Sequence, residues 1–110
     1  MAEEERFNAA FLKILDEQLK SLVGEVAVRS FYRHLLNHYN LDFGDIPKNI
    51  EVFAKAFQEY FGSSANPLQK MLLIKMHSRF GRPFREGPFA ESIVRLKVAV
   101  MREGLLYFGR

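Results

Sequence analysis

The sequence predicts an all-α protein, a single compact bundle of about five helices that occupies residues 1–110 as one domain. Two observations lead to this prediction. Apolar residues recur every three or four positions through most of the chain, as in amphipathic helices, and the alternation typical of strands is nearly absent. Apolar residues make up 48% of the chain, eleven of them Phe, which is enough for the core of one domain.

The first helix is predicted over residues 4–22, where apolar side chains form one stripe and charged side chains cover the remaining surface. Gly24 interrupts this pattern. A second stripe then predicts a helix over residues 25–39. The predicted core positions of the two helices are Phe7, Phe11, Ile14, Leu15, Leu19, Leu22, Val28, Phe31, Tyr32, Leu35, Leu36 and Tyr39.

Residues 40–47 contain chain breakers and show no helical period, so they are predicted to form a loop. A third helix is predicted over residues 49–61. It ends before Gly62, which stands where glycine commonly caps a helix. Its predicted core positions are Ile50, Phe53, Ala54, Phe57 and Phe61.

Asn66 is predicted to cap a fourth helix over residues 67–80, because Pro67 then takes the first helical position. This helix is apolar around most of its circumference, which predicts a central, buried place. Residues 81–88, GRPFREGP, form a predicted loop with two prolines and two glycines. A fifth amphipathic helix is predicted over residues 89–103.

Composition excludes several classes of site. The chain has no Cys, so it cannot hold a disulfide, an iron–sulfur cluster or a thiolate metal site. The first residues, MAEEER, are acidic and unlike a secretory signal. The apolar runs fall far short of the roughly 20 residues that span a bilayer. We therefore expect a cytoplasmic protein without a membrane partner.

Charge is distributed unevenly along the chain. Residues 1–66 carry seven Lys/Arg and ten Asp/Glu, a net charge of −3, whereas residues 67–110 carry nine and three, a net charge of +6. Two interpretations stay open. The basic half attracts an acidic partner or nucleic acid, or the two halves neutralise each other within the fold.

No motif for catalysis or cofactor binding is found. The serines lie in no nucleophile elbow, and the glycines form neither a P-loop nor a dinucleotide-binding pattern. His34 and His38 share one side of a helix, but the sequence places no third ligand beside them. Asp42 and Asp45 lack the ligand spacing of a calcium loop. The sequence thus predicts a protein that is not an enzyme and has no cofactor or metal.

Nucleic acid is a possible partner of the basic half. The third and fourth helices have the proportions of a helix-turn-helix, but the fourth is too apolar to read base edges. A better candidate is a basic surface that would contact phosphates without sequence specificity. Its predicted contact residues are Arg82, Arg85, Arg95, Lys97 and Arg102.

The C-terminal tail is a second candidate surface. It is apolar but short, and a monomer would have to cover it. We predict that it packs on the domain or forms an interaction patch for another protein or a second copy of the chain. The patch residues are Leu105, Leu106, Tyr107 and Phe108.

Residues 14–81 resemble the NitrOD-type output domain, a small helical domain of archaeal proteins. The resemblance lies in LKSLVGEVAVRSFYRHL at 19–35, in DFGDIPKNIEVFAKAFQEYFG at 42–62, and in the helix that follows to Gly81. It implies a regulatory or output role in an archaeal protein, and it supplies no catalytic residues. Residues 82–110 lie outside it.

The sequence therefore predicts a non-enzymatic regulatory or protein-interaction domain. The alternative is a nucleic-acid-binding protein that uses the basic C-terminal half.

Overall fold

The computed structural model describes residues 2–103, and it confirms the predicted all-α bundle. Its five α-helices are α1 (Ala2–Val23), α2 (Glu25–Tyr39), α3 (Ile50–Phe61), α4 (Ala65–Arg79) and α5 (Phe89–Arg102). Two short 3₁₀ helices, η1 (Phe43–Lys48) and η2 (Gly62–Ser64), flank α3. The described part of the chain contains no strand and no helix that is long and apolar enough to cross a membrane.

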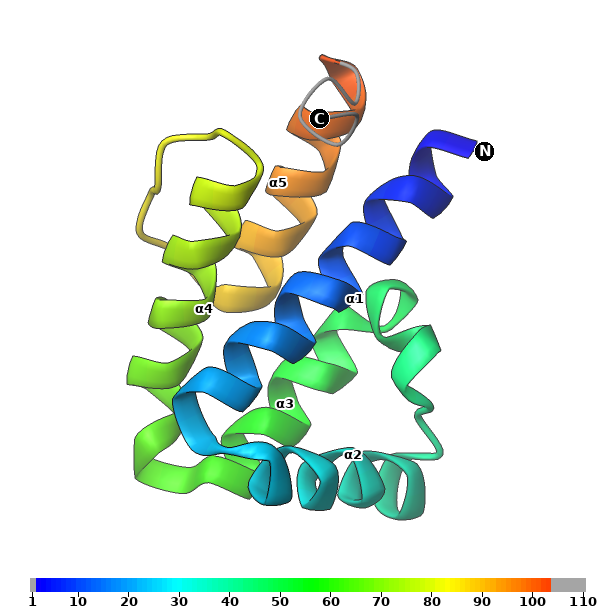
Figure 1. Cartoon of the computed structure of the whole chain (residues 1–110), viewed down its shortest axis with the longest axis vertical. Coiled ribbons are helices and arrows are strands. Elements are labelled where there is room, and N and C mark those ends of the chain that lie inside the picture. The colour runs from blue at the N-terminus through cyan, green and yellow to red at the C-terminus, as the bar shows by residue number, and fades with distance from the viewer. Residues whose placement is uncertain (1, 104–110) are drawn as a thin grey trace.

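The long helix α1 runs diagonally across the molecule and packs against α2, α4 and α5 (Figure 1). Helix α3 packs against α2, α4 and α5 as well, and α2 closes one end of the bundle. Each helix therefore buries one stripe against several neighbours, which is the packing that the apolar period predicts.

An aromatic cluster forms the part of the core where α2 meets α3. The ring of Phe31 is fully buried, and its centroid lies 5.1–6.3 Å from the centroids of five other aromatic rings. Phe89 extends the cluster to α5, because its ring lies 6.2 Å from that of Phe53 and 6.3 Å from that of Phe57. Rings at such distances add favourable contacts to the burial of apolar area. The neighbours of Phe31 are Tyr32, Phe53, Phe57, Tyr60 and Phe61.

Residues 43–48 form a 3₁₀ helix, so the prediction of an irregular loop was wrong there. Asn40 ends α2 in the left-handed conformation, with φ of 52°, and Asn tolerates this conformation better than most residues. Phe43 and Ile46 then lie three residues apart, which places both on one side of a 3₁₀ helix. Ile46 is fully buried and Phe43 packs on Tyr32, so tertiary contacts select this turn.

The start of α4 also differs from the prediction. The helix begins at Ala65, directly after η2, and no side chain caps it. Asn66 lies inside the first turn, where its Oδ1 accepts a hydrogen bond of 2.7 Å from Gln58 Nε2. The predicted cap was wrong because the amide side chain pairs with α3.

Helix α4 is buried on one side only, contrary to the central place predicted for it. Its buried residues form one stripe against α1, α3 and α5, whereas Met71 and Ile74 are 46% and 41% exposed. Its neighbours cover that stripe alone, so the apolar residues outside it face solvent.

Ion pairs connect the acidic and basic halves of the chain. Lys97 Nζ on α5 lies 2.7 Å from Glu4 Oε2 on α1, and Arg79 Nη1 on α4 lies 3.4 Å from Glu17 Oε1. Mutual neutralisation of the halves is therefore part of the explanation for the uneven charge. It pairs two basic residues of the second half, Arg79 and Lys97, with acidic residues of the first.

Replacing Phe31 by Ala should lower the free energy of unfolding by about 3–5 kcal/mol, because it leaves a cavity among the rings. This is a large part of the roughly 5–15 kcal/mol that stabilises a typical domain. Urea denaturation measures it, with Val26→Ala at an 83% exposed position as the control. Equal losses in the two variants would contradict a core built around Phe31.

Stability should fall in acid. Hydrogen bonds and charge from Lys97, Arg29 and Arg82 lower the pKa values of Glu4, Glu25 and Glu103, respectively, below the ordinary value of 4.5. Their contribution is complete above pH 4.5 and is lost as pH falls through the lowered pKa values.

Urea midpoints at pH 6 and pH 3 check this expectation. The variant Lys97→Met should lose less stability between the two pH values, because the pKa of Glu4 then returns toward its ordinary value. A midpoint that does not change with pH would count against these ion pairs.

Candidate functional site: an arginine-lined pocket on α5

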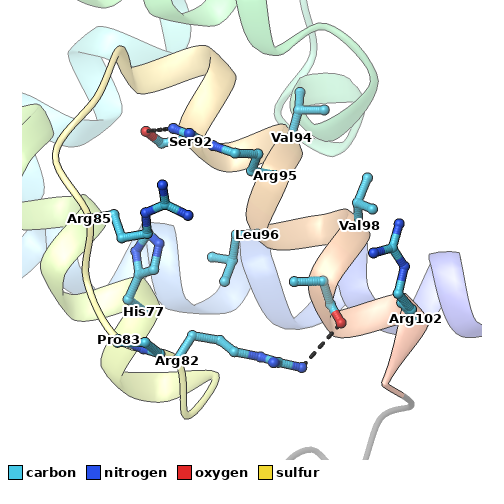
Figure 2. A pocket seen from close by; sticks show the side chains of 11 residues that line it. His77, Arg82, Pro83, Arg85, Ser92, Val94, Arg95, Leu96, Val98 and Arg102 are labelled. Carbon is cyan, nitrogen blue, oxygen red and sulfur yellow. Dashed lines mark hydrogen bonds between the residues drawn. The ribbon is translucent and has the colours of Figure 1, made fainter.

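A pocket of about 500 Å³ lies between α5, the end of α4 and the segment that joins them (Figure 2). Pockets that bind small molecules usually have volumes of about 300–1,000 Å³. Eleven residues line it, and none of them is acidic. Four of them are arginines: Arg82, Arg85, Arg95 and Arg102.

The end of α4 starts the wall of the pocket. Gly81 takes a left-handed conformation with φ of 70°, and the amide of Arg82 donates a hydrogen bond of 2.8 Å to the carbonyl oxygen of His77. This ending turns the chain out of α4 and back toward α5. Phe84 then packs edge-on against the His77 ring, with 5.7 Å between centroids.

Gly87 brings the segment close to α5. A Cβ atom at this position would lie 2.8 Å from Arg95 Nη2 and 3.2 Å from Ser92 Oγ. Real Cβ atoms essentially never come as close as the first of these distances, so glycine leaves room for the guanidinium group. Arg95 Nη2 also lies 3.4 Å from Ser92 Oγ, to which it donates.

Arg82 is held by the end of α5. Its Nη2 donates to the carbonyl oxygen of Ala99 at 3.1 Å, and its Nη1 lies 2.8 Å from Glu103 Oε1. The side chain is 15% exposed. A cation suits the C-terminal end of a helix, where carbonyl groups lack helical partners. Arg82 therefore joins the segment to α5, and Glu103 neutralises its charge.

The charges of the other three pocket arginines are not paired with a carboxylate of the described residues. Arg85, Arg95 and Arg102 are exposed, and none of them forms an ion pair with a residue in the range 2–103. Two neighbouring carboxylates pair with other residues: Glu103 binds Arg82, which lowers the pKa of this carboxyl group through a hydrogen bond and its positive charge, and Glu86 binds Lys70. The pocket therefore presents a positive potential that an anion would neutralise.

Apolar side chains line the pocket between the arginines. Leu96 is buried and lies in its wall, and Pro83 and Ala99 line it as well. Val94 and Val98 complete the apolar lining at 52% and 48% exposure, one turn apart on α5. The site thus combines charge with an apolar surface that is left in contact with water.

Lys97 lies away from this group. It follows Ile93 by four positions, which turns it toward α1, where it pairs with Glu4. Four of the five predicted contact residues therefore line one pocket. Of these four, Arg82 forms an ion pair with Glu103.

Two polar residues of the pocket were not identified from the sequence. Ser92 and His77 are 2% and 8% exposed, although they line the pocket. His77 Nδ1 lies 2.7 Å from the carbonyl oxygen of Leu73, so Nδ1 carries the proton and donates. No sequence signal marks either residue, because an isolated Ser or His in a helix is common in other roles.

Two other features singled out in the sequence are the C-terminal patch and the pair of histidines. Leu105, Leu106, Tyr107 and Phe108 lie outside the described residues. The rings of His34 and His38 lie 4.4 Å apart, yet residues 2–103 contain no group of three or more potential ligands that could hold a metal ion.

No family model matches the chain, and comparisons with curated proteins and with solved structures give no match either. The resemblance to the NitrOD-type output domain stays a prediction from the sequence.

Proposed function

We propose that this chain is a non-enzymatic regulatory or protein-interaction domain, and that it binds an acidic partner through the exposed face of α5. The single observation that supports this is that Val94 and Val98 lie beside arginines that form no ion pair within residues 2–103. Arg85, Arg95 and Arg102 together with these two valines are called the arginine–valine face below.

The chemistry of the arginine–valine face favours a protein segment. Apolar side chains left exposed beside charges are a common feature of interaction surfaces, and arginine is enriched there. Guanidinium groups form paired hydrogen bonds with carboxylates, and the valines would be covered by apolar side chains. The expected partner therefore carries Asp or Glu together with Leu, Ile or Phe.

Selection from a random peptide-display library with the full chain tests this proposal. We expect the enriched peptides to combine acidic with apolar residues. Binding should weaken about tenfold in Arg95→Glu, since one close charge pair is lost and repulsion replaces it. It should weaken about fivefold in Val94→Ser/Val98→Ser, because about 1 kcal/mol of apolar burial is lost.

Val26→Ser on α2 is the matched control, since Val26 is 83% exposed and lies on another helix. It should leave peptide binding unchanged. Peptides without a charge bias, or equal binding to all variants, would contradict the proposal.

A second candidate function is nucleic-acid binding by the same arginines. The specific observation in its favour is that three guanidinium groups without an ion pair in the described part of the chain line one pocket. Phosphate contacts of this kind are independent of sequence and sensitive to salt. The apolar valines between the arginines favour the protein partner instead, since a phosphate backbone would leave them uncovered.

Titration of duplex DNA at several salt concentrations tests this alternative. Three phosphate contacts predict a slope of log K against log salt of about −2.7. Arg102→Gln should make the slope shallower by about one unit, and Lys97→Gln should leave it unchanged because Lys97 pairs with Glu4. Absence of binding at low salt would exclude this function.

A further inference from the structure

We propose that the pocket, whose lining includes the five residues of the arginine–valine face, is a binding site for a small organic anion, a carboxylate or phosphate monoester that carries an apolar chain. The inference rests on the proposed function in one respect: the ligand would act as an effector of the surface to which the pocket opens. Binding of the ligand itself requires only the pocket.

The charged groups define the head of the ligand. Arg85 comes from the segment between α4 and α5, and Arg95 comes from α5, so two guanidinium groups reach the pocket from different elements. In the view of Figure 2, Arg85 and His77 lie at the end of the pocket that contains Ser92. Fixed guanidinium donors match the oxygens of carboxylates and phosphates.

Buried polar groups strengthen the case for a built site. Arg82 lines the pocket, and its Nε atom is buried without a hydrogen-bond partner within residues 2–103. Ser92 Oγ accepts only a long contact from Arg95, at 3.4 Å. Polar groups that are buried in a pocket wall are normally hydrogen-bonded, and an anionic head would bring acceptor oxygen atoms to the N–H group of Arg82 Nε and to the hydroxyl group of Ser92.

The volume and the apolar lining define the remainder of the ligand. A pocket of about 500 Å³ is far larger than one inorganic phosphate, and such an ion would leave Val98 and Ala99 in contact with water. Covering apolar area stabilises a complex by roughly 25 cal/mol per Å². An apolar chain attached to the anionic head would make use of this surface.

Concavity distinguishes this ligand from the macromolecular partner. Ligand pockets are mostly apolar with a few convergent polar groups, and this composition is found here. Val94 and Val98 lie at the exposed part of the lining, whereas Leu96 is only 3% exposed. A peptide would therefore cover the valines, and a small molecule would reach Leu96.

Calorimetry on the full chain tests the proposal with octyl phosphate and decanoate, both below the concentrations at which they form micelles. We expect saturable one-to-one binding of at least one of the two, which also identifies the preferred head group. Inorganic phosphate alone and octanol should each bind at least tenfold more weakly. Equal affinity for either of these probes would overturn the proposal, because head or chain would then be unnecessary.

Variants locate the site. Arg85→Gln and Arg95→Gln should each weaken binding about tenfold, and Ala99→Phe should abolish it by filling the pocket. Arg29→Gln is the matched control, since it removes the same charge from an exposed pair with Glu25 on α2. Circular dichroism shows whether each variant folds. If Ala99→Phe does not fold, the two variants of exposed arginines still test the site. Undiminished binding in Arg85→Gln/Arg95→Gln would overturn the assignment.

The two proposals fail separately. Peptide selection without any binding of octyl phosphate or decanoate would remove the small-molecule site and leave the interaction domain. Binding of octyl phosphate or decanoate without any selected peptide would remove the interaction domain and leave the small-molecule site.

Discussion

Burial of aromatic rings around Phe31 is the interaction on which the remaining structure depends. Phe31 joins α2 to α3 through Phe53 and Phe57, and Phe89 carries the same packing to the start of α5. This contact anchors the start of α5 on α3, and packing against α1 and α4 holds the rest of the helix. Since all four pocket arginines belong to α5 or to the segment that precedes it, the core also contributes to where their charge is presented.

The pocket is formed by the end of α4, by the segment that follows it, and by one arginine that binds this segment to α5. Gly81 turns the chain out of α4, and Gly87 allows it to pass close to Arg95. Arg82 then holds the segment against the last turn of α5 through Ala99 and Glu103. One arginine thus connects two parts of the structure, whereas the guanidinium groups of the other three are exposed. The two roles separate because Glu103 forms its ion pair with Arg82, and the other pocket arginines form no ion pair within residues 2–103.

The candidate site was partly predictable. The excess of basic residues after position 66 drew attention to the four arginines that line the pocket, because helix α5 and the preceding segment are continuous in sequence. Lys97 could not be separated from them, since its partner Glu4 lies 93 positions away on α1. His77 and Ser92 were missed for a similar reason. Their role depends on which residues fold over them, and nothing in their own sequence neighbourhood records it.

Local order was determined by the sequence alone. The apolar period specifies helices and their buried sides, because backbone hydrogen bonding repeats every 3.6 residues whatever the partner helix is. Tertiary structure alone decided which apolar residues of α4 stay exposed, why residues 43–48 wind into a 3₁₀ helix, and which cations remain unpaired. These outcomes depend on contacts between residues distant in the chain, where burial and charge compensation are properties of the assembled surface and not of any segment.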